Sequence, residues 1–347
     1  MLMQEQFILA LEEQCREYLT PQEFSAFLDA LPKEFPPGFT ENSAGSAFLR
    51  ILQAIPSRAT FIRELSRYPF HLKIVSSLAL HSNYLTDIVV RNPEFLYTTF
   101  QEELLILPLN EDELLASLSQ KRFAGKSVSF VGTVLRLMKR REMLRIGLKD
   151  ILGLADLQGI VADLSLLAKV LSATLLDHAV SLAAARHTID PSLFSYCAVS
   201  LGKLGGRELN YSSDIDLLVF FDTPQEEMTL PVFEMMNEAV QWFIREATAY
   251  TDAGFLYRVD FRLRPDGKNA PLVRTLHEYL FYYETRGEDW ERQMLLKSDF
   301  LGGDRKLFQS FISYLTPFIY QSCGPLPVTS QIASLRREVT RKLRDDE

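Results

Sequence analysis

Two aspartates that stand two positions apart open the most informative stretch of the sequence. Asp214 and Asp216 precede an apolar run, and residues two apart on a strand project to one face, so Ile215 would enter the core. Two like charges held this close raise each other's pKa unless a cation lies between them. Mg²⁺, which prefers carboxylate and phosphate oxygens, would resolve the repulsion. Ser213 would then donate its hydroxyl or its backbone N–H to a phosphate group.

A pair of glycines precedes these aspartates. Gly205 and Gly206 follow a predicted strand, and glycines let the backbone approach phosphate oxygens closely. If Arg207 opens a helix, its free N–H groups and the helix dipole would favour the negative charge. The pair alone is a weak motif, but its position beside the aspartates predicts a phosphate-binding turn.

A third carboxylate is predicted on a later strand, at Asp260. It would position a second metal ion or act as a base. If residues 255–263 form a strand, alternation places it on one face with three arginines, Arg258, Arg262 and Arg264. Arginines this close repel one another unless anions bind there, so they would suit phosphate or pyrophosphate. A solvent-facing edge of alternating charge is the alternative, and the upstream glycine and aspartate motifs favour the phosphate interpretation.

The segment 288–297 predicts a short helix that could complete the site. Trp290, Met294 and Leu295 would face inward, and Lys297 would reach a nucleotide or order the arginines of the strand. The alternative is a helix with ordinary surface charge, and this alternative is favoured when the segment is considered alone.

These residues need a scaffold, and the first part of the chain predicts helices. Residues 1–190 form the predicted helical N-terminal region, broken by proline-containing stretches. A capping box at Thr20 and Glu23 predicts that one helix begins at Pro21. Residues 134–151 predict an amphipathic helix with a basic outer face, which would contact phosphate or an acidic partner. A simple solvated face is the favoured alternative.

The pattern changes after residue 190 to alternating strands and helices. Strands are predicted at 194–201, 217–221 and 255–263. A helix is predicted at 232–248. We therefore predict an α+β fold in which a mixed-sheet core, residues 191–300, is embedded in a mainly helical chain. Residues 301–347 form the predicted C-terminal helical segment.

Composition limits the class of protein. The chain has 347 residues, of which 47% are hydrophobic and 24% charged, as in folded globular proteins. The net charge of -8 and the pI near 5.4 give no overall attraction for nucleic acid. Cys15, Cys197 and Cys323 are too far apart in sequence to suggest a disulfide framework or a zinc site.

Two further observations bear on location. The first residues carry Glu5, Glu12 and Glu13 and lack a basic stretch followed by an apolar core, so no secretory signal is predicted. No apolar run is predicted to be long enough to cross a bilayer. With cysteine usage that fits a reducing compartment, we expect a cytoplasmic protein with no nucleic acid and no membrane among its partners.

The motifs together resemble a known family. The glycine pair, the Ser-Asp-x-Asp at 213–216 and Asp260 resemble the DNA polymerase β nucleotidyltransferase superfamily, which makes the mixed-sheet core a nucleotidyltransferase domain. The strings 201–221, 258–265 and 289–297 resemble the glutamine synthetase adenylyltransferase/adenylyl-removing family, and the preceding helical region resembles its N-terminal, adenylyl-removing half. Three separated motifs in the same order make the resemblance specific, and it spans most of the chain.

The resemblance implies a reaction, a cofactor and partners. Such enzymes transfer AMP from ATP to a tyrosine of glutamine synthetase, or remove it by phosphorolysis to yield ADP, under control of the PII signal protein and glutamine. Mg²⁺ or Mn²⁺ would be the metal, and ATP or ADP the nucleotide. The reaction would be an in-line displacement at a nucleotide phosphorus.

The resemblance also assigns roles to residues. The metal ligands and catalytic acids would be Asp214, Asp216 and Asp260. The nucleotide-binding residues would be Gly205, Gly206, Ser213, Arg262, Arg264 and Lys297. Two features depart from the family. Its members carry two catalytic modules in a chain more than twice this long, and they tend to have Lys-Ala-Arg where this chain has Lys297-Ser298-Asp299.

Two other functions remain open on the sequence. One is uridylyl transfer to PII or nucleotidyl transfer to another protein, since the uridylyl enzyme has a similar glycine and Ser-Asp-x-Asp segment. The other is a catalytically silent regulator that binds nucleotide or glutamine synthetase. The three carboxylates argue against silence, whereas Asp299 favours it by removing a positive charge near the expected nucleotide pocket.

Overall fold

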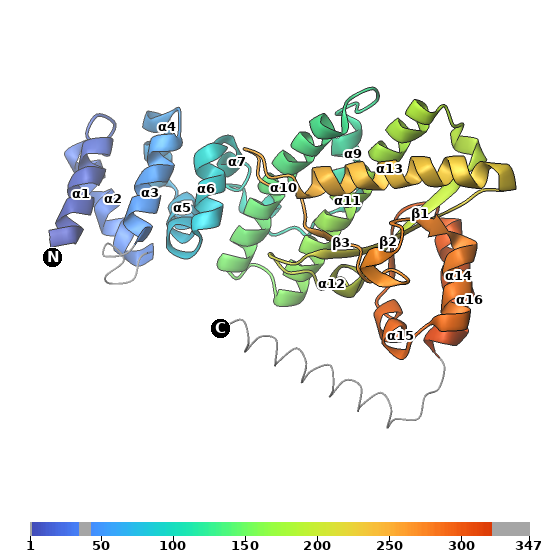
Figure 1. The fold of residues 1–347 in the computed structure, drawn as a ribbon. Coiled ribbons are helices and arrows are strands. Elements are labelled where there is room, and N and C mark those ends of the chain that lie inside the picture. The colour runs from blue at the N-terminus through green and yellow to red at the C-terminus, as the bar shows by residue number, and fades with distance from the viewer. Residues whose placement is uncertain (1, 35–42, 321–347) are drawn as a thin grey trace.

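The computed structural model describes residues 2–34 and 43–320, and its first half is a succession of helices (Figure 1). These helices are α1 (Leu2–Cys15), α2 (Pro21–Glu34), α3 (Ser43–Ala54), α4 (Arg58–Arg67), α5 (Pro69–His81), α6 (Asn83–Arg91), α7 (Glu94–Tyr97), α8 (Glu102–Leu105), α9 (Glu111–Ser119), α10 (Val128–Ile151) and α11 (Leu157–His187). In Figure 1, α1 to α6 stand side by side in a row that leads to the long helices α10 and α11.

The second helix begins where its capping residues predict. α2 starts at Pro21. The Thr20 N–H donates to Glu23 Oε2 at 2.8 Å, and the Glu23 N–H donates to Thr20 Oγ1 at 3.3 Å. These bonds satisfy N–H groups that the start of a helix leaves free. The predicted capping box is confirmed.

Two residues of the basic outer face predicted for α10 are buried, as is Arg136 of the same helix. The two are Lys139 and Lys149. Lys149 Nζ pairs with Asp163 Oδ2 of α11 at 2.7 Å, and Lys139 Nζ donates to the Leu256 carbonyl at 2.5 Å. Buried charges require such partners. The prediction is wrong for these residues because their long side chains tie α10 to neighbouring elements instead of facing water.

The prediction that no apolar run could cross a bilayer is wrong for α11. This helix has 31 residues and contains a window of mean hydropathy 1.7, which is long and apolar enough by length and composition. In the structure, 61% of that window is buried inside the protein, where α11 packs against α10 and α13. A core helix of a globular protein passes the same test, because burial on several sides also requires apolar residues.

The second half of the described chain contains a mixed five-stranded sheet, as predicted. The strands are β1 (Ser195–Leu201), β2 (Ile215–Asp222), β3 (Val259–Asp260), β4 (Arg274–Thr275) and β5 (Asp299–Gly303). Their order is β3-β2-β1-β5, and β4 also pairs with β2. β1 is antiparallel to β2 and β5, whereas β3 and β4 are parallel to β2. The strand predicted at 255–263 is reduced to the two residues of β3.

Helices accompany the sheet. They are α12 (Gly202–Gly205), α13 (Thr229–Thr248), α14 (Leu276–Arg286), α15 (Asp289–Leu295) and α16 (Arg305–Ile319), with short 3-10 turns at Pro191–Leu193, Glu226–Met228 and Gly267–Asn269. α13 confirms the helix predicted at 232–248. Of the C-terminal segment predicted at 301–347, the part from residue 321 onward lies outside the described residues, as does Cys323.

Side chains of β2 alternate between two hydrophobic cores. Ile215 and Leu217 join the larger core, which includes residues of α10, α11 and α13. Leu218 and Phe220 join a second core with residues of α14 and α16. Because successive residues of a strand face opposite sides, Asp216 lies on the same face as Leu218, at the start of β2. The predicted inward direction of Ile215, which is fully buried, is confirmed.

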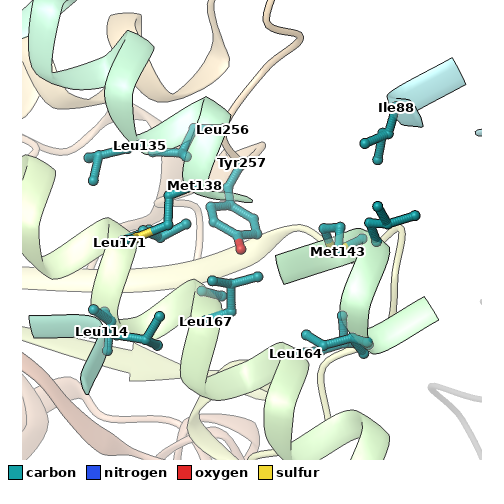
Figure 2. Packing of buried hydrophobic residues seen from close by; sticks show 14 of the residues in the cluster. Ile88, Leu114, Leu135, Met138, Met143, Leu164, Leu167, Leu171, Leu256 and Tyr257 are labelled. Atoms are coloured by element: carbon teal, nitrogen blue, oxygen red, sulfur yellow. The ribbon is translucent and has the colours of Figure 1, made fainter. Parts of the chain in front are cut away.

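The segment that leads into β3 is anchored in the larger core. Figure 2 shows Leu256 and Tyr257 among side chains of α10 and α11, such as Met138 and Leu167. The N–H groups of Leu256 and Tyr257 both donate to the Ala247 carbonyl at 3.0 Å. This anchor fixes where the chain enters the edge of the sheet beside β2.

Candidate active site

Asp216 and Asp260 are direct neighbours on two parallel strands. β2 and β3 pair so that these two residues lie opposite each other, and neighbouring strands are about 4.8 Å apart. Burial raises the pKa of Asp216, and the negative charges of Asp260 and Asp214 raise it further. The sequence predicts a repelling pair between Asp214 and Asp216, and the structure adds Asp260 as the stronger of the two neighbours.

Asp260 is held by Arg262. The Arg262 Nε donates to Asp260 Oδ2 at 2.7 Å, and the Arg262 backbone N–H donates to Asp260 Oδ1 at 2.7 Å. The hydrogen bond from the Arg262 side chain is the main cause that lowers the pKa of Asp260 below its ordinary value. The site therefore combines a carboxyl group held ionised by a guanidinium with a neighbour whose charge is disfavoured, a contrast typical of functional sites.

Asp214 lies just before β2 and contacts Arg258. The Arg258 Nε donates to Asp214 Oδ1, and the Arg258 Nη2 donates to the Ser212 carbonyl at 2.6 Å. The hydroxyl of Ser213 donates to Asn210 Oδ1, and the Asn210 N–H donates to Ser213 Oγ at 3.3 Å. Ser213 thus closes the turn before β2, and Arg258 holds the first aspartate in place.

Gly202 is a site residue that the sequence analysis missed. It follows β1 with φ +56, and a Cβ atom there would lie 2.5 Å from Asp216 Oδ2. Only glycine adopts this conformation readily and leaves room for the carboxylate. The next residue, Lys203, is close enough for its charge to lower the pKa of Asp216. The sequence does carry a signal for it, since Gly202 is the first glycine after the predicted strand 194–201.

Gly205 and Gly206 pack against the segment that holds Lys297. A Cβ atom at Gly205 would collide with the backbone carbonyls of Lys297 and Ser200, and one at Gly206 would lie 3.2 Å from the Lys297 side chain. Arg207 does not open a helix. It follows α12 with φ +56, so that prediction is wrong. The glycine pair allows a close approach of two backbone segments beside the aspartates.

Arg264 is buried within its own loop and not aligned with Arg258 and Arg262. Its guanidinium donates to the Phe261 carbonyl at 2.7 Å, to the Lys268 carbonyl at 2.9 Å and to the Ala270 carbonyl at 2.6 Å. The predicted alternation of three arginines on one strand face is therefore wrong. The strand ends at residue 260, and the chain then turns around the buried guanidinium.

The described residues contain no group of three His, Cys, Asp or Glu side chains placed to hold a metal ion. Asp214 pairs with Arg258, whereas Asp216 and Asp260 are neighbours on paired strands. The donor set nevertheless suits a hard divalent cation, since it consists of carboxylates. Burial raises the pKa of Asp216 most, and the charges of Asp260 and Asp214 raise it further.

A comparison with known proteins identifies the family. A family model described as glutamate-ammonia ligase adenylyltransferase matches residues 72–313, more than half of the chain. This chain belongs to the glutamate-ammonia ligase adenylyltransferase family. The matched region contains both the paired carboxylates of the sheet and the helices that anchor β3.

Two curated relatives of this chain carry the name bifunctional glutamine synthetase adenylyltransferase/adenylyl-removing enzyme. The protein of Thioalkalivibrio sulfidiphilus is 32% identical over 285 residues, which are 77% of this chain and 29% of the relative. That of Methylococcus capsulatus is 34% identical over 221 residues, 61% of this chain and 23% of the relative. The chain thus spans less than a third of the length of the curated relatives it matches.

The predicted helix at 288–297 exists in this family member as α15, but its buried face differs. Trp290 is 38% exposed, so its predicted inward direction is wrong, whereas Leu295 is buried as predicted. Glu291 is buried instead, and Tyr282 donates to its Oε1 at 3.1 Å. Burial raises the pKa of Glu291. The Lys297 ammonium lies beyond the helix and pairs with Glu208.

Asp299, the residue that departs from the family's Lys-Ala-Arg string, has a partner in this chain. Its Oδ2 accepts hydrogen bonds from Arg207 Nε at 3.2 Å and from Arg207 Nη2 at 3.1 Å. Arg207 directly follows the glycine pair, so this ion pair joins the start of β5 to the turn after α12. The acidic residue therefore lies beside the site and carries no unpaired charge.

Proposed function

We propose that this member of the adenylyltransferase family is a metal-dependent nucleotidyltransferase that acts on glutamine synthetase. The side-by-side placement of Asp216 and Asp260 on parallel strands supports the proposal most strongly. The names of the relatives point to the protein substrate. The proposed reaction is phosphorolytic removal of AMP from a tyrosine to yield ADP, with transfer of AMP from ATP as the alternative direction.

Asp216 and Asp260 would hold Mg²⁺ or Mn²⁺, and Asp214 would join them when Arg258 releases it. Burial and then the negative charges of Asp260 and Asp214 raise the pKa of Asp216, and a bound cation would relieve the repulsion among these charges. A divalent cation held by these carboxylates would supply electrostatic stabilisation of the negative charge that develops on the phosphate group. Gly202 leaves the space in which the Asp216 carboxylate lies.

The flanking cations would bind the nucleotide phosphates. Arg262 is suited to this, because its side chain is 74% exposed while it touches Asp260. Arg258 is likewise exposed and would be freed when Asp214 turns to the metal. The proposed site is completed by two lysines, Lys203 and Lys297. It also includes the predicted phosphate-binding residues Gly205, Gly206 and Ser213. Arg264 stays with its loop, where it supports the position of Arg262.

The proposal extends to domains and partners. Residues 191–300 would be the catalytic unit, flanked by the helical regions 1–190 and 301–347. The PII signal protein is a proposed regulator, whereas nucleic acid and membranes are not proposed as partners, and the proposed location is the cytoplasm. Glutamine synthetase would present its modified tyrosine to the edge of the sheet where Asp260 lies.

Mass spectrometry of glutamine synthetase tests both the activity and its direction. Adenylylated glutamine synthetase is incubated with the chain, inorganic phosphate and Mg²⁺, and unmodified glutamine synthetase is incubated with the chain, ATP and Mg²⁺. Loss of AMP from the tyrosine with formation of ADP supports removal, whereas gain of AMP supports transfer.

Two controls sharpen the result. The double variant Asp214→Asn with Asp216→Asn should abolish the change in mass, since it removes two proposed metal ligands. If neither reaction occurs in the wild-type chain, or if the double variant remains fully active, the proposed function is wrong. Transfer of UMP to PII in a parallel incubation would instead support the uridylyl alternative.

A further inference from the structure

A cavity of about 660 Å³ lies where the N-terminal helices meet the segment that leads into β3. Its walls come from α6, from α10 and from residues 250–258. The volume is within the usual range for small-molecule sites, about 300–1,000 Å³. Asp214, Asp216 and Asp260 are not among its lining residues, but Arg258 and Ser212 are, so the cavity adjoins the candidate active site without containing its carboxylates.

Positive charge dominates the lining of this cavity. The cationic side chains are those of Arg91, Arg136, Lys139, Arg140 and Arg258. The two carboxylates of the lining are already engaged, since Asp87 pairs with Arg50 and Asp150 accepts a hydrogen bond from Tyr211. Arg136 pairs with Glu246 and Arg258 pairs with Asp214. The excess of positive charge therefore lies on Arg91, Lys139 and Arg140, which form no ion pair with the described residues.

Two guanidinium groups converge on one backbone oxygen in this cavity. Arg140 Nη2 donates to the Asp252 carbonyl at 2.6 Å, and Arg91 Nη1 donates to the same oxygen at 3.3 Å. A single carbonyl cannot satisfy two such groups, each of which has five N–H donors. Burial lowers the pKa of Arg140, and the like charge of Arg91 lowers it further.

A buried arginine also lines the cavity. Arg136 is 1% exposed and its Nη1 pairs with Glu246 Oε1 at 2.7 Å, whereas its Nε has no hydrogen-bond acceptor among the residues that the structure describes. Tyr84 and Tyr250 also line the cavity, and both are largely exposed, so aromatic surface is available at its opening. Arginine clusters bind phosphate groups well because the planar fork of donors matches phosphate oxygens.

We propose that this cavity binds a phosphate-bearing ligand between Arg91 and Arg140, separately from the reacting nucleotide. The shared chemistry is the phosphate dianion, which either inorganic phosphate or a nucleoside monophosphate could supply. The negative charge of the ligand balances the two guanidinium groups. Its phosphate oxygens accept hydrogen bonds from the N–H groups that do not donate to the Asp252 carbonyl. Arg258 lines the same cavity and holds Asp214, so the ligand lies next to the residue that positions the first aspartate.

Isothermal titration calorimetry of the whole chain with EDTA present tests this proposal. Inorganic phosphate, AMP and adenosine are titrated separately, and EDTA removes metal-dependent binding at the active site. We expect phosphate or AMP to bind and adenosine not to bind. The double variant Arg91→Gln with Arg140→Gln should weaken binding by at least about tenfold, since two charge-assisted contacts are lost.

Three controls distinguish this site from others. Arg63→Gln removes an exposed arginine of α4 that does not line the cavity, and it should leave binding unchanged. Asp216→Asn should also leave this metal-free binding unchanged. The proposed function is tested by AMP turnover and this site by metal-free binding, so the two proposals can fail independently. Far-UV circular dichroism should show that the variants remain folded. Absence of phosphate and AMP binding at millimolar concentration, equal binding of adenosine, or equal loss in either control variant would overturn the proposal.

Discussion

The variant Gly202→Ala should reduce the rate of AMP removal far more than its small loss of stability can explain. A Cβ atom at this position would lie 2.5 Å from Asp216 Oδ2, whereas ordinary contacts begin at 3.4 Å. The carboxylate must therefore retreat by about 0.9 Å, which is 3.4 minus 2.5. A displacement of about 1 Å of a reacting or ligating group can reduce a rate roughly 100-fold. We expect a loss of that order in the rate of AMP removal.

The same variant has a backbone cost that can be measured separately. Gly202 has φ +56, and a left-handed conformation costs an alanine about 1–2 kcal/mol. Gly153 is the matched control, because it has φ +65 and a Cβ atom there meets nothing within 4 Å. Gly153→Ala should lose a similar free energy of unfolding in urea while its rate of AMP removal stays at the wild-type value.

Initial rates of AMP release and urea unfolding curves together give the answer. Both variants should show similar destabilisation, and only Gly202→Ala should show the large loss of rate. The reasoning is refuted if Gly202→Ala keeps the wild-type rate, since Asp216 would then tolerate displacement. An equal loss of rate in Gly153→Ala would also refute it, because backbone strain alone would explain the effect.

Three further variants test other contacts. Lys149→Met should lower the free energy of unfolding in urea by about 3–5 kcal/mol, because it leaves Asp163 buried without its partner. Arg264→Gln should lower it by roughly 3 kcal/mol, since several backbone carbonyls of its loop lose their donor. Asp260→Asn should lower the pKa of Asp216 in a carboxyl ¹³C NMR titration with EDTA, because a neighbouring negative charge is removed.

The two stability variants each have a control variant, and all three predictions have an outcome that would contradict them. Lys169→Met breaks a more exposed ion pair with Glu111 and should cost less than about 1 kcal/mol. Arg262→Gln, at a largely exposed side chain, should leave stability nearly unchanged while it reduces the rate of AMP removal. Destabilisation as large as that of the buried variants would contradict the assigned roles. An unchanged pKa of Asp216 would show that Asp260 does not act on it.

Local patterns predicted several elements correctly. The capping box at Thr20 placed the start of α2, and the apolar run before and after the aspartates gave β1 and β2. These predictions succeeded because capping and strand alternation depend on residues that are neighbours in sequence. The inward direction of Ile215 follows from the same alternation.

Contacts between distant parts of the chain explain what the sequence could not show. Arg264 looked like the third arginine of a strand, but the loop carbonyls that bury its guanidinium end β3 after two residues. Lys139 looked exposed, but the Leu256 carbonyl lies beside it only in the folded chain. Gly202 must be a glycine because the Asp216 carboxylate of the neighbouring strand occupies the space of a Cβ atom. None of these partners can be read from spacing alone.

The most direct test of the account compares two aspartates on the same strand. Asp216 lies at the start of β2 beside Asp260, whereas Asp222 is exposed at the end of that strand. The measurement is the Mg²⁺-dependent rate of AMP release from adenylylated glutamine synthetase. We predict that Asp216→Asn reduces this rate by about 1,000-fold or more, as expected for loss of a metal ligand at the reacting phosphate, and that Asp222→Asn leaves it unchanged. Wild-type turnover by Asp216→Asn would contradict the central claim.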